Sequence, residues 1–201
     1  MIKLITQSIR QTIVWTLLAG VVYTVVMTVV AQLLFPAQAN GSLVEKDGKI
    51  VGSTLLAQQF TGTNYFWPRP SACGYGTGPS GIAASSGSNL GPTSGALQTN
   101  VQNNITAFLT GNNLPTNTPV PADMVYASAS GLDPEISPEA AQLQIKRVAA
   151  SRGLAEEKVT ALVTEFTQQP QWGFLGQARV NVLRLNLALD KLAGESQPVK
   201  K

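Results

Sequence analysis

The sequence predicts one N-terminal transmembrane helix followed by a single extracytoplasmic α+β domain. Three observations lead to this prediction: a long uncharged run near the N-terminus, basic residues without acidic ones before that run, and a later chain that combines a hairpin signal with helical periodicity. The expected divisions are a cytoplasmic N-terminus at 1–12, the transmembrane helix at 13–35, the exterior domain at 36–192 and a loose tail at 193–201.

The uncharged run extends from Ile13 to Phe35 and covers 23 residues. As an α-helix it would be about 34 Å long, enough to cross a hydrocarbon core about 30 Å thick. A cleaved signal peptide is one alternative, because Ala37-Gln38-Ala39 has the form of a cleavage site, but its apolar region would be only about 7–15 residues long. A buried helix of a soluble protein is the other, but such helices are seldom apolar on every face. The length of the run therefore favours a membrane anchor.

Charge on the two sides of the run predicts its orientation. Lys3 and Arg10 precede it, and the first acidic residue of the chain is Glu45. After the run, Lys46 and Lys49 are offset by nearby acids. The positive-inside rule therefore predicts a single-pass protein of the plasma (inner) membrane, with a cytoplasmic N-terminus and residues 36–201 in the periplasm or outside the cell.

Small and polar residues recur every fourth position along the predicted span. They form one stripe on a helix, consisting of Thr16, Gly20, Thr24, Thr28 and Gln32. Small residues let helix backbones approach closely, and hydroxyls or amides can bond across such a contact. A chance distribution of threonines is the alternative. We interpret the stripe as a transmembrane partner face, for a second copy of the chain or for another subunit.

Composition excludes several classes of function. The net charge is +3 and only 12% of residues are charged, so the nearly neutral exterior domain lacks the clustered basic face that nucleic acid requires. Cys73 is the only cysteine, so no internal disulfide can form. The chain has no histidine, which removes the commonest metal ligand and the commonest general base. No metal site and no catalytic residue is predicted.

The exterior domain is predicted to begin where the anchor helix ends, with a β-hairpin soon after. Pro36 ends the anchor helix because it lacks an amide donor and restricts the residue before it. Asp47-Gly48 between short apolar segments predicts a β-hairpin over residues 43–52. Farther on, apolar residues at spacings of four, four and three predict an amphipathic helix over about 94–109. These apolar residues are Leu97, Val101, Ile105 and Phe108.

The C-terminal part predicts two helices and one ambiguous element. Ser137-Pro138-Glu139 has the residues of a helix start, and the helix is expected to run to about Ser151 with Gly153 as its stop. A second helix is expected to open at Glu156 and to end before Pro170. Residues 180–192 fit both a strand and a helix, and leucine content favours the helix.

A long irregular segment separates the hairpin from the first exterior helix. Residues 62–95 are rich in Gly, Ser, Pro and Asn, and loops of this length are usually functional or disordered. The embedded aromatics indicate that the loop buries area against something, and they are Tyr65, Phe66, Trp67 and Tyr75. Its glycines resemble a phosphate-binding loop only superficially, because no Gly-Lys-Ser/Thr follows.

Two other classes of function remain as alternatives. Without histidine, a nucleophilic serine could be activated only by a lysine, and no recognised Ser–Lys motif is present. A membrane-tethered exported Ser–Lys enzyme is one alternative. A periplasmic ligand-binding module is the other, because aromatic residues lie among glycines in the loop.

Several motifs occur in an order that resembles a known family. The motifs are FPAQANGSL at 35–43, QQF at 58–60, YFWPRPSA at 65–72, SGSNLGPT at 86–93, ASASGLDP at 127–134, RVA at 147–149 and VNVLRLNLALD at 180–190. Together they are similar to the C subunit of the Kdp-type potassium-transporting P-type ATPase, over roughly residues 10–192. The sequence departs from the family pattern at Glu135 and in the glycine-rich insert at 74–85.

The resemblance implies a non-catalytic accessory subunit of a high-affinity potassium uptake complex. In that family a channel-like subunit selects potassium, a P-type ATPase subunit hydrolyses ATP, and the C subunit supports assembly and acts as a catalytic chaperone for ATP hydrolysis. These two subunits and the lipid bilayer are the expected partners, and the complex, not this chain, handles ATP and K⁺. Because ATP is cytoplasmic and the domain is predicted outside, we expect any effect on ATP to be indirect.

The sequence and the resemblance nominate two further sets of site residues. The low-charge loop at 62–95 is predicted to pack on the extracellular mouth of the potassium-selecting subunit, through Tyr65, Phe66, Trp67, Arg69, Ser88 and Asn89. The resemblance also implies a family-style nucleotide contact at Ser128, Ser130, Gly131 and Gln144.

Overall fold

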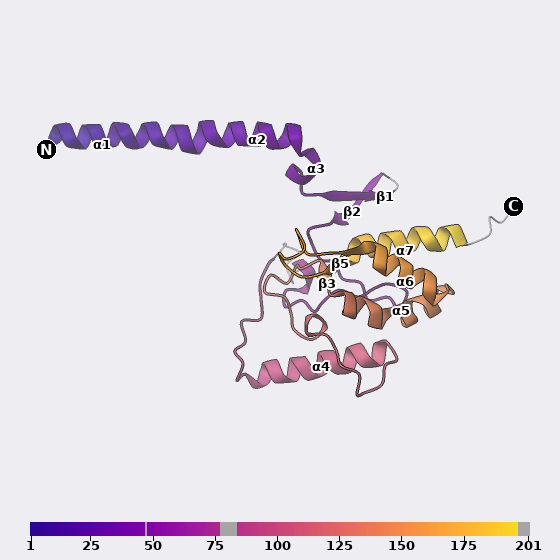
Figure 1. The fold of residues 1–201 in the computed structure, drawn as a ribbon. Coiled ribbons are helices and arrows are strands. Elements are labelled where there is room, and N and C mark those ends of the chain that lie inside the picture. Colours follow the sequence, from indigo (N-terminus) through magenta and orange to yellow (C-terminus); the bar gives the residue numbers. More distant parts are fainter. Residues whose placement is uncertain (47, 77–83, 197–201) are drawn as a thin grey trace. The chain divides into compact units, whose positions relative to one another are not determined.

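A computed structural model describes residues 1–46, 48–76 and 84–196 of the chain (Figure 1). The chain divides into two compact units, Met1–Ser53 and Thr54–Lys201. Each unit is described by itself below.

The first unit begins with one continuous helical segment. It consists of α1 (Ile2–Trp15), a π-helical stretch η1 (Thr16–Val22) and α2 (Tyr23–Leu34). These 33 residues have a mean hydropathy of 2.2 in their most apolar window, and the segment is long and apolar enough to cross a membrane. The helix starts eleven residues before the predicted span, because residues 2–12 continue its hydrogen bonding without a break. Its length of about 50 Å exceeds the hydrocarbon core.

The helix ends where Pro36 predicts that it should. Phe35 leaves the helical conformation with φ −136° and ψ 53°, and Pro36 then opens the short helix α3 (Pro36–Ala39). The predicted hairpin is confirmed as β1 (Leu43–Lys46) paired antiparallel with β2 (Lys49–Ser53). Gly48 supports the turn with a φ of +73°, and Asp47 lies outside the described residues.

The described residues of the second unit form four α-helices and a small antiparallel sheet. The helices are α4 (Gly95–Gly111), α5 (Pro138–Arg152), α6 (Glu156–Phe166) and α7 (Val182–Ser196). The strands, in the sheet order β3-β5-β4, are β3 (Glu135–Ile136), β5 (Arg179–Asn181) and β4 (Thr167–Gln168). Two short 3₁₀ helices are η2 (Gly74–Gly76) and η3 (Ala122–Met124). The α+β class is confirmed.

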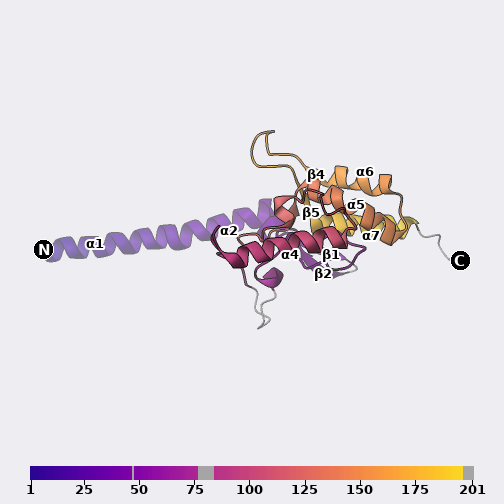
Figure 2. The same ribbon diagram turned by 90° about the horizontal axis from the view of Figure 1, so that it is seen from below.

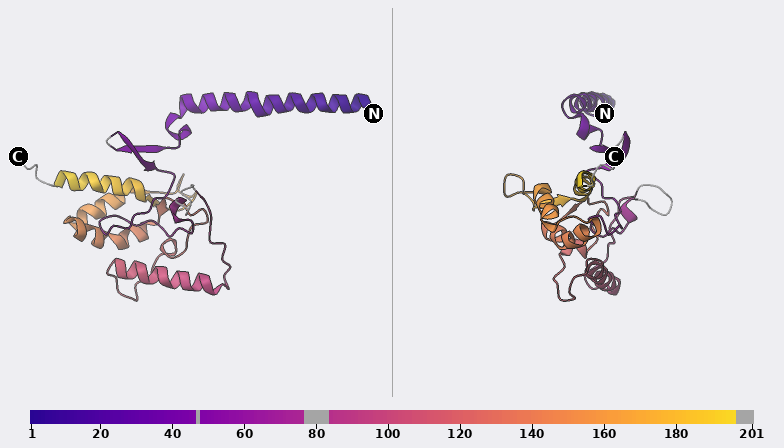
Figure 3. Two further views of the ribbon diagram at one scale, coloured as in Figure 1. Left: turned by 180° about the vertical axis from the view of Figure 1, so that it is seen from behind. Right: turned by 90° about the vertical axis from the view of Figure 1, so that its right-hand side faces the viewer.

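Helices α5, α6 and α7 lie side by side with the sheet at one end, and α4 runs apart from them (Figures 1 and 3). The predicted start of α5 is confirmed, since the Ser137 hydroxyl accepts from the Ala140 amide at 3.1 Å. Its stop is Gly153, in the left-handed region at φ +64°. The largest fully buried apolar side chains of the domain core are Phe66, Leu185, Leu189, Val148, Val159 and Val180.

The ambiguous stretch contains both predicted structures in succession. Residues 179–181 form the central strand β5, and α7 follows at once from Val182. Leu185 and Leu189 are four residues apart and both have 0% exposure, so the helical stripe is the one that faces the core. The helix runs to Ser196, beyond the residue at which the loose tail was expected to begin.

Candidate functional site

The aromatic segment at residues 62–67 is held by side chains from two helices. The Phe66 amide donates to Asn186 Oδ1 at 2.8 Å, and Asn186 Nδ2 donates back to the Phe66 carbonyl at 3.0 Å. The Trp67 amide likewise donates to Gln144 Oε1 at 2.7 Å, and Gln144 Nε2 donates back to the Trp67 carbonyl at 3.3 Å. Both side-chain amides are buried, and they satisfy backbone groups that a neighbouring strand would otherwise satisfy.

Arg147 of α5 is a buried cation beneath the same segment. Its guanidinium donates to the carbonyls of Thr63 (2.5 Å) and Tyr65 (2.9 Å), and Nε donates to Asn112 Oδ1 at 2.8 Å. The guanidinium carbon lies 4.0 Å from the centre of the Trp67 ring, a cation–π contact. Burial lowers the pKa of Arg147 to about 10, so the side chain stays charged at neutral pH.

Arg152 completes the support on the exposed side of the segment. Its Nε donates to the Asn64 carbonyl at 2.6 Å, and Nη2 pairs with Asp190 of α7 at 2.8 Å. The guanidinium lies 4.7 Å from the Tyr65 ring centre. Every carbonyl from Thr63 to Trp67 thus accepts from one of four side chains, which we call the loop clamp: Gln144, Arg147, Arg152 and Asn186.

The loop clamp leaves one face of the aromatic segment lining a pocket beside α4. Trp67 and Tyr75 line this hollow of about 480 Å³ together with Phe60, Asn104 and Phe108. The Tyr75 hydroxyl donates to the Arg69 carbonyl at 3.1 Å, and burial raises the pKa of Tyr75. Of the predicted partner-contact residues, Phe66 is in the core, Ser88 and Asn89 are exposed, and the other three are half-buried.

Glycine is required where α4 meets this segment. A Cβ at Gly111 would overlap the Trp67 indole, so any larger residue would displace the ring from Arg147. The last turn of α4 and the aromatic segment are therefore packed at the closest distance that the backbone allows.

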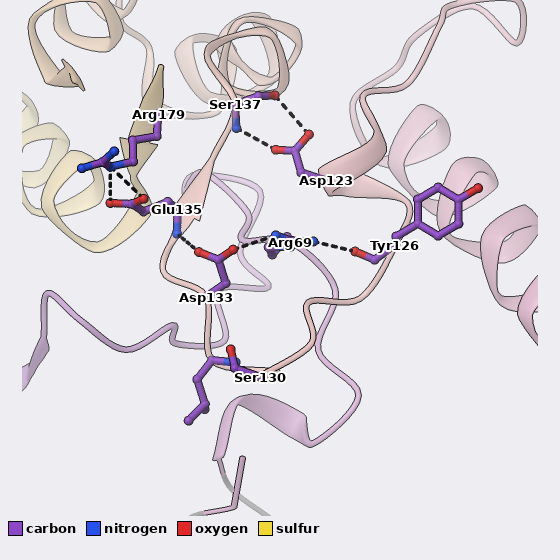
Figure 4. Close-up of polar contacts among 9 residues, drawn as sticks. Arg69, Asp123, Tyr126, Ser130, Asp133, Glu135, Ser137 and Arg179 are labelled. Carbon is purple, nitrogen blue, oxygen red and sulfur yellow. Dashed lines mark hydrogen bonds and ion pairs between the residues drawn. The ribbon is translucent and has the colours of Figure 1, made fainter. Parts of the chain in front are cut away.

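Arg69 ties the aromatic loop to the turn at 128–134 (Figure 4). Its Nη1 pairs with Asp133 Oδ2 at 2.6 Å, and Nη2 donates to the Tyr126 carbonyl at 3.4 Å. Asp133 Oδ1 also accepts from the Glu135 amide at 3.0 Å. Asp133 therefore organises the turn that leads into β3.

The two neighbouring acids also have structural partners (Figure 4). Glu135 pairs with Arg179 of the adjacent strand at 2.9 Å. Asp123 accepts from the Ser137 amide at 2.6 Å and from its hydroxyl at 3.1 Å, which extends the cap of α5. These carboxylates hold the sheet and the helix start together.

The residues of the family-style nucleotide contact do not all meet. Ser128 and Ser130 line a pocket of about 760 Å³ with Arg69, and Gly131 lies in the same turn at φ +68°. Ser128 Oγ and Arg69 Nε are buried and have no hydrogen-bond partner among the described residues. Gln144 does not line this pocket, because it belongs to the loop clamp and bonds Trp67.

Two hydroxyls of the predicted transmembrane face bond to the backbone of their own helix. Thr24 donates to the Gly20 carbonyl at 2.7 Å, and Thr28 donates to the Thr24 carbonyl at 2.8 Å. Gln32 exchanges hydrogen bonds with the side chain of Asn40, at 3.1 Å and 3.3 Å, just beyond the helix end. A Cβ at Gly20 would meet no atom within 4 Å, so this part of the face is open to a neighbour.

Comparison with known proteins decides the family. The family described as the K⁺-transporting ATPase c chain, KdpC, matches residues 5–191. The chain belongs to the KdpC family. This confirms the resemblance that the sequence motifs indicated, and the match includes residues of both structural units.

The KdpC relatives are similar over nearly their whole lengths. Proteins named potassium-transporting ATPase KdpC subunit from Methylococcus capsulatus and Herpetosiphon aurantiacus are 54% and 53% identical, over 90% of this chain and 93% and 92% of their own lengths. One of the same name from Mycobacterium tuberculosis is 49% identical over 92% of this chain and 96% of its own length.

Two features of this KdpC chain were not predicted from its sequence. The loop clamp is one, although Asn186 among alternating leucines of α7 is a signal that a polar group is needed in the core. The other is an exposed aromatic loop between β4 and β5, which carries Trp172 at 85% exposure and Phe174 at 74%.

Proposed function

We propose that this chain is a non-catalytic accessory subunit that helps to assemble and stabilise the potassium-transporting ATPase complex of its family. The observation that carries the proposal is how the domain uses its acids. Asp133 and Glu135 pair with arginines, and Asp123 caps α5. Carboxylates held in this way stabilise a surface and are poorly placed to act as general bases or nucleophiles. The arrangement therefore favours binding over chemistry.

In this proposal the helical segment crosses the plasma (inner) membrane once, with its N-terminus in the cytoplasm and the domain in the periplasm or outside the cell. Lys3 and Arg10 near the start of α1 support this orientation. The cytoplasmic segment at 1–12, the span at 13–35 and the exterior domain at 36–192 are the divisions it implies.

Cys73 offers a direct test of the orientation, because it is the only cysteine and is partly exposed. A maleimide that cannot cross membranes is expected to label Cys73 in intact spheroplasts. The matched control is Cys73→Ser, which should not be labelled. Labelling only after the membrane is permeabilised would place the domain in the cytoplasm and reverse this part of the proposal.

The partner face of the helix is proposed to dock by close packing against a helix of the channel-like potassium-selecting subunit or of the P-type ATPase subunit. Because Thr24 and Thr28 bond their own backbone, the contact would depend on shape around Gly20 and not on hydrogen bonds across it. Thr16 and Gln32 extend the same stripe along the helix.

The test of the face is co-purification of the complex in detergent through a tag on this chain. Gly20→Leu with Thr24→Leu is expected to lower recovery of the other subunits by at least about fivefold, because the larger side chains prevent the close approach of helix backbones that small residues allow. Val26→Leu is the control, because Val26 is two residues from Thr24 and so points to the opposite side of the helix. Unchanged recovery of the double variant would reject the docking face.

The aromatic loop is proposed to pack on the extracellular mouth of the potassium-selecting subunit. Tyr65, Trp67 and Arg69 are half-buried and backed by the loop clamp or by Asp133, so little ordering entropy is lost when a partner binds. Phe66 would contribute by fixing the segment from within the core. Ser88 and Asn89 would supply the polar rim.

Support for ATP hydrolysis would then be indirect. Contacts that differ between two states of the larger subunits bias the equilibrium between those states, and a nucleotide site elsewhere responds through linkage. K⁺ and ATP would remain ligands of the larger subunits.

A direct nucleotide contact is the second candidate. It is supported by Ser128 Oγ and Arg69 Nε, which are buried at one pocket and have no hydrogen-bond partner within the part of the chain that the structure describes. Ser128→Ala should then weaken binding of a fluorescent ATP analogue to the chain in nanodiscs, while Ser88→Ala should not. Equal binding by both variants would exclude the site, and periplasmic labelling of Cys73 would exclude it on grounds of access.

A further inference from the structure

The loop between β4 and β5 projects from the domain as a narrow hairpin-like element (Figures 2 and 3). We call residues 169–178 the tryptophan finger. Its tip carries three apolar side chains: Trp172 at 85% exposure, Phe174 at 74% and Leu175 at 42%. Large apolar side chains gathered on one projection differ from singly scattered ones, and such a patch marks an interaction site.

The tryptophan finger is built to present these side chains. Gln171 and Leu175 exchange two backbone hydrogen bonds of 3.0 Å and 2.9 Å, which close the neck of the tip. Trp172 itself has a φ of +53°, a left-handed conformation that is unfavourable for a bulky residue. The Trp172 and Phe174 rings lie 6.4 Å apart between centroids. The backbone therefore holds both rings together on the exposed tip.

Charge is absent along the whole sequence of this element. No charged residue occurs from 167 to 178, and the nearest charges along the chain are Glu165 and Arg179. Arg179 is paired with Glu135 at the base of the sheet. Polar residues of the tryptophan finger are glutamines, which can stay hydrated while the tip is buried.

We propose that the tryptophan finger inserts Trp172, Phe174 and Leu175 into the interfacial layer of the lipid bilayer on the side of the membrane where the domain lies. Tryptophan prefers this layer because its ring is apolar and its N–H can bond to water or headgroups. The covalent link keeps the domain within reach of the membrane, since only residues 35–53 separate the end of α2 from the start of the second unit.

The size of the tip favours lipid over a protein partner. Three side chains fall far short of the roughly 1,200–2,000 Å² of total surface that a specific protein interface buries. An interfacial contact has no such minimum when a membrane helix already anchors the chain, because each apolar residue adds to binding independently. The tryptophan finger would thus act as a second attachment point that restrains the domain at the bilayer.

The test uses the full-length chain in nanodiscs with a Trp15→Phe background, which leaves Trp67 and Trp172 as fluorophores. Emission of Trp172 is the difference between this protein and the Trp15→Phe/Trp172→Phe variant. Lipids brominated near the headgroup are expected to quench that difference at least about twofold, because an interfacial tryptophan lies at the depth of the bromines. The remaining Trp67 emission is the internal control and should not be quenched.

Two outcomes would overturn the proposal. Trp172 emission that brominated lipid leaves unchanged would show that the tip stays in water. In the assembled complex, a photo-crosslinker introduced at position 172 should form lipid adducts, with the same crosslinker at exposed Gln102 of α4 as control. A crosslink from position 172 to another subunit would assign the tip to a protein partner. Neither result would affect membership of the complex, which rests on other residues.

Discussion

In the first unit, Met1–Ser53, which we call the helical unit, Thr24 and Thr28 donate to carbonyls four residues earlier. In the second unit, which is the domain, Asn186 by contrast bonds a residue 120 positions earlier. The first pattern satisfies polar groups within one segment, as lipid demands. The second satisfies an irregular backbone inside a core by bringing amides from distant helices. The helical unit can therefore form before it meets a partner, whereas the aromatic loop acquires its shape only once α5 and α7 have packed.

Substitutions in the two units are therefore expected to have different effects. A change on the outer face of the helix alters contacts with neighbours and leaves the helix intact. A change in the loop clamp leaves buried carbonyls without donors, and each orphaned group costs about 1–3 kcal/mol. Folding defects are thus expected from the domain, and assembly defects from the helix.

The largest effect is expected from Arg147→Met. The substitution removes the donors to Thr63, Tyr65 and Asn112 together, and we expect a loss of at least about 3 kcal/mol in the free energy of unfolding. Urea denaturation of the full chain in detergent, followed by tryptophan fluorescence, measures it. Arg184→Met is the control, because Arg184 is exposed on α7 and should change stability by less than about 0.5 kcal/mol. Equal midpoints for the two variants would contradict the loop clamp.

A smaller loss is expected from Asn186→Leu, about 2–3 kcal/mol, because the cost of two orphaned groups is partly offset by added apolar burial. The variant leaves the amide and the carbonyl of Phe66 unpaired inside the core, while the leucine fills a similar volume. Asn186→Ala would add a cavity, so its loss of stability would combine the missing hydrogen bonds with lost packing. If Asn186→Leu instead raises stability, the bonds to Phe66 contribute less than apolar packing at this site, and the helix pair alone must position the loop.

Local patterns predicted the elements whose hydrogen bonds are local. The hairpin, α4, α5 and α6 each have signals within a few residues, such as Asp47-Gly48 for the turn and Ser137-Pro138 for a helix start. The uncharged run also predicted an apolar helix, and a helix long and apolar enough to cross a membrane is present at Ile2–Leu34, whereas the span at 13–35 within it stays a prediction. The full length of that helix was not predicted, and residues 180–192 fitted both a strand and a helix, because periodicity alone does not mark where one short apolar element ends and the next begins.

The hydrogen bonds between residues far apart in the chain could not be predicted from the sequence. Gln144 is separated from Trp67 by 77 positions, and nothing in a single chain indicates which loop a buried amide will bond. The aromatics were predicted to bury area, and Phe66 does so against its own domain. Whether Tyr65, Trp67 and Arg69 contact a partner remains a prediction. The tryptophan finger was missed because no pattern within residues 169–178 distinguishes an exposed aromatic side chain from a buried one.

Thr24→Val should sharpen the contrast between the two units by changing almost nothing in the isolated chain. The hydroxyl bonds only to its own helix, at Gly20 and Val21, so its removal leaves no distant group unpaired. We expect the helix content in detergent, measured by circular dichroism, to match that of the parent protein. A clear loss of helix would show that the hydroxyl holds the π-helical stretch, and that the helical unit is less independent than its local bonds indicate.

The reactivity of the Cys73 thiol reports the packing of the aromatic loop. The hydrogen bond with Ser71, at 3.6 Å between Oγ and Sγ, is the main cause that lowers the pKa of Cys73, followed by a backbone bond from Ser86. Alkylation proceeds through the thiolate, so the labelling rate should reach half its maximum at a lower pH than for a free cysteine. Ser71→Ala should move that midpoint upward, and Ser88→Ala should leave it in place. If Ser71→Ala leaves the pH midpoint unchanged, the Ser71 hydroxyl bonds only to the Gly131 carbonyl, to which it donates at 2.7 Å.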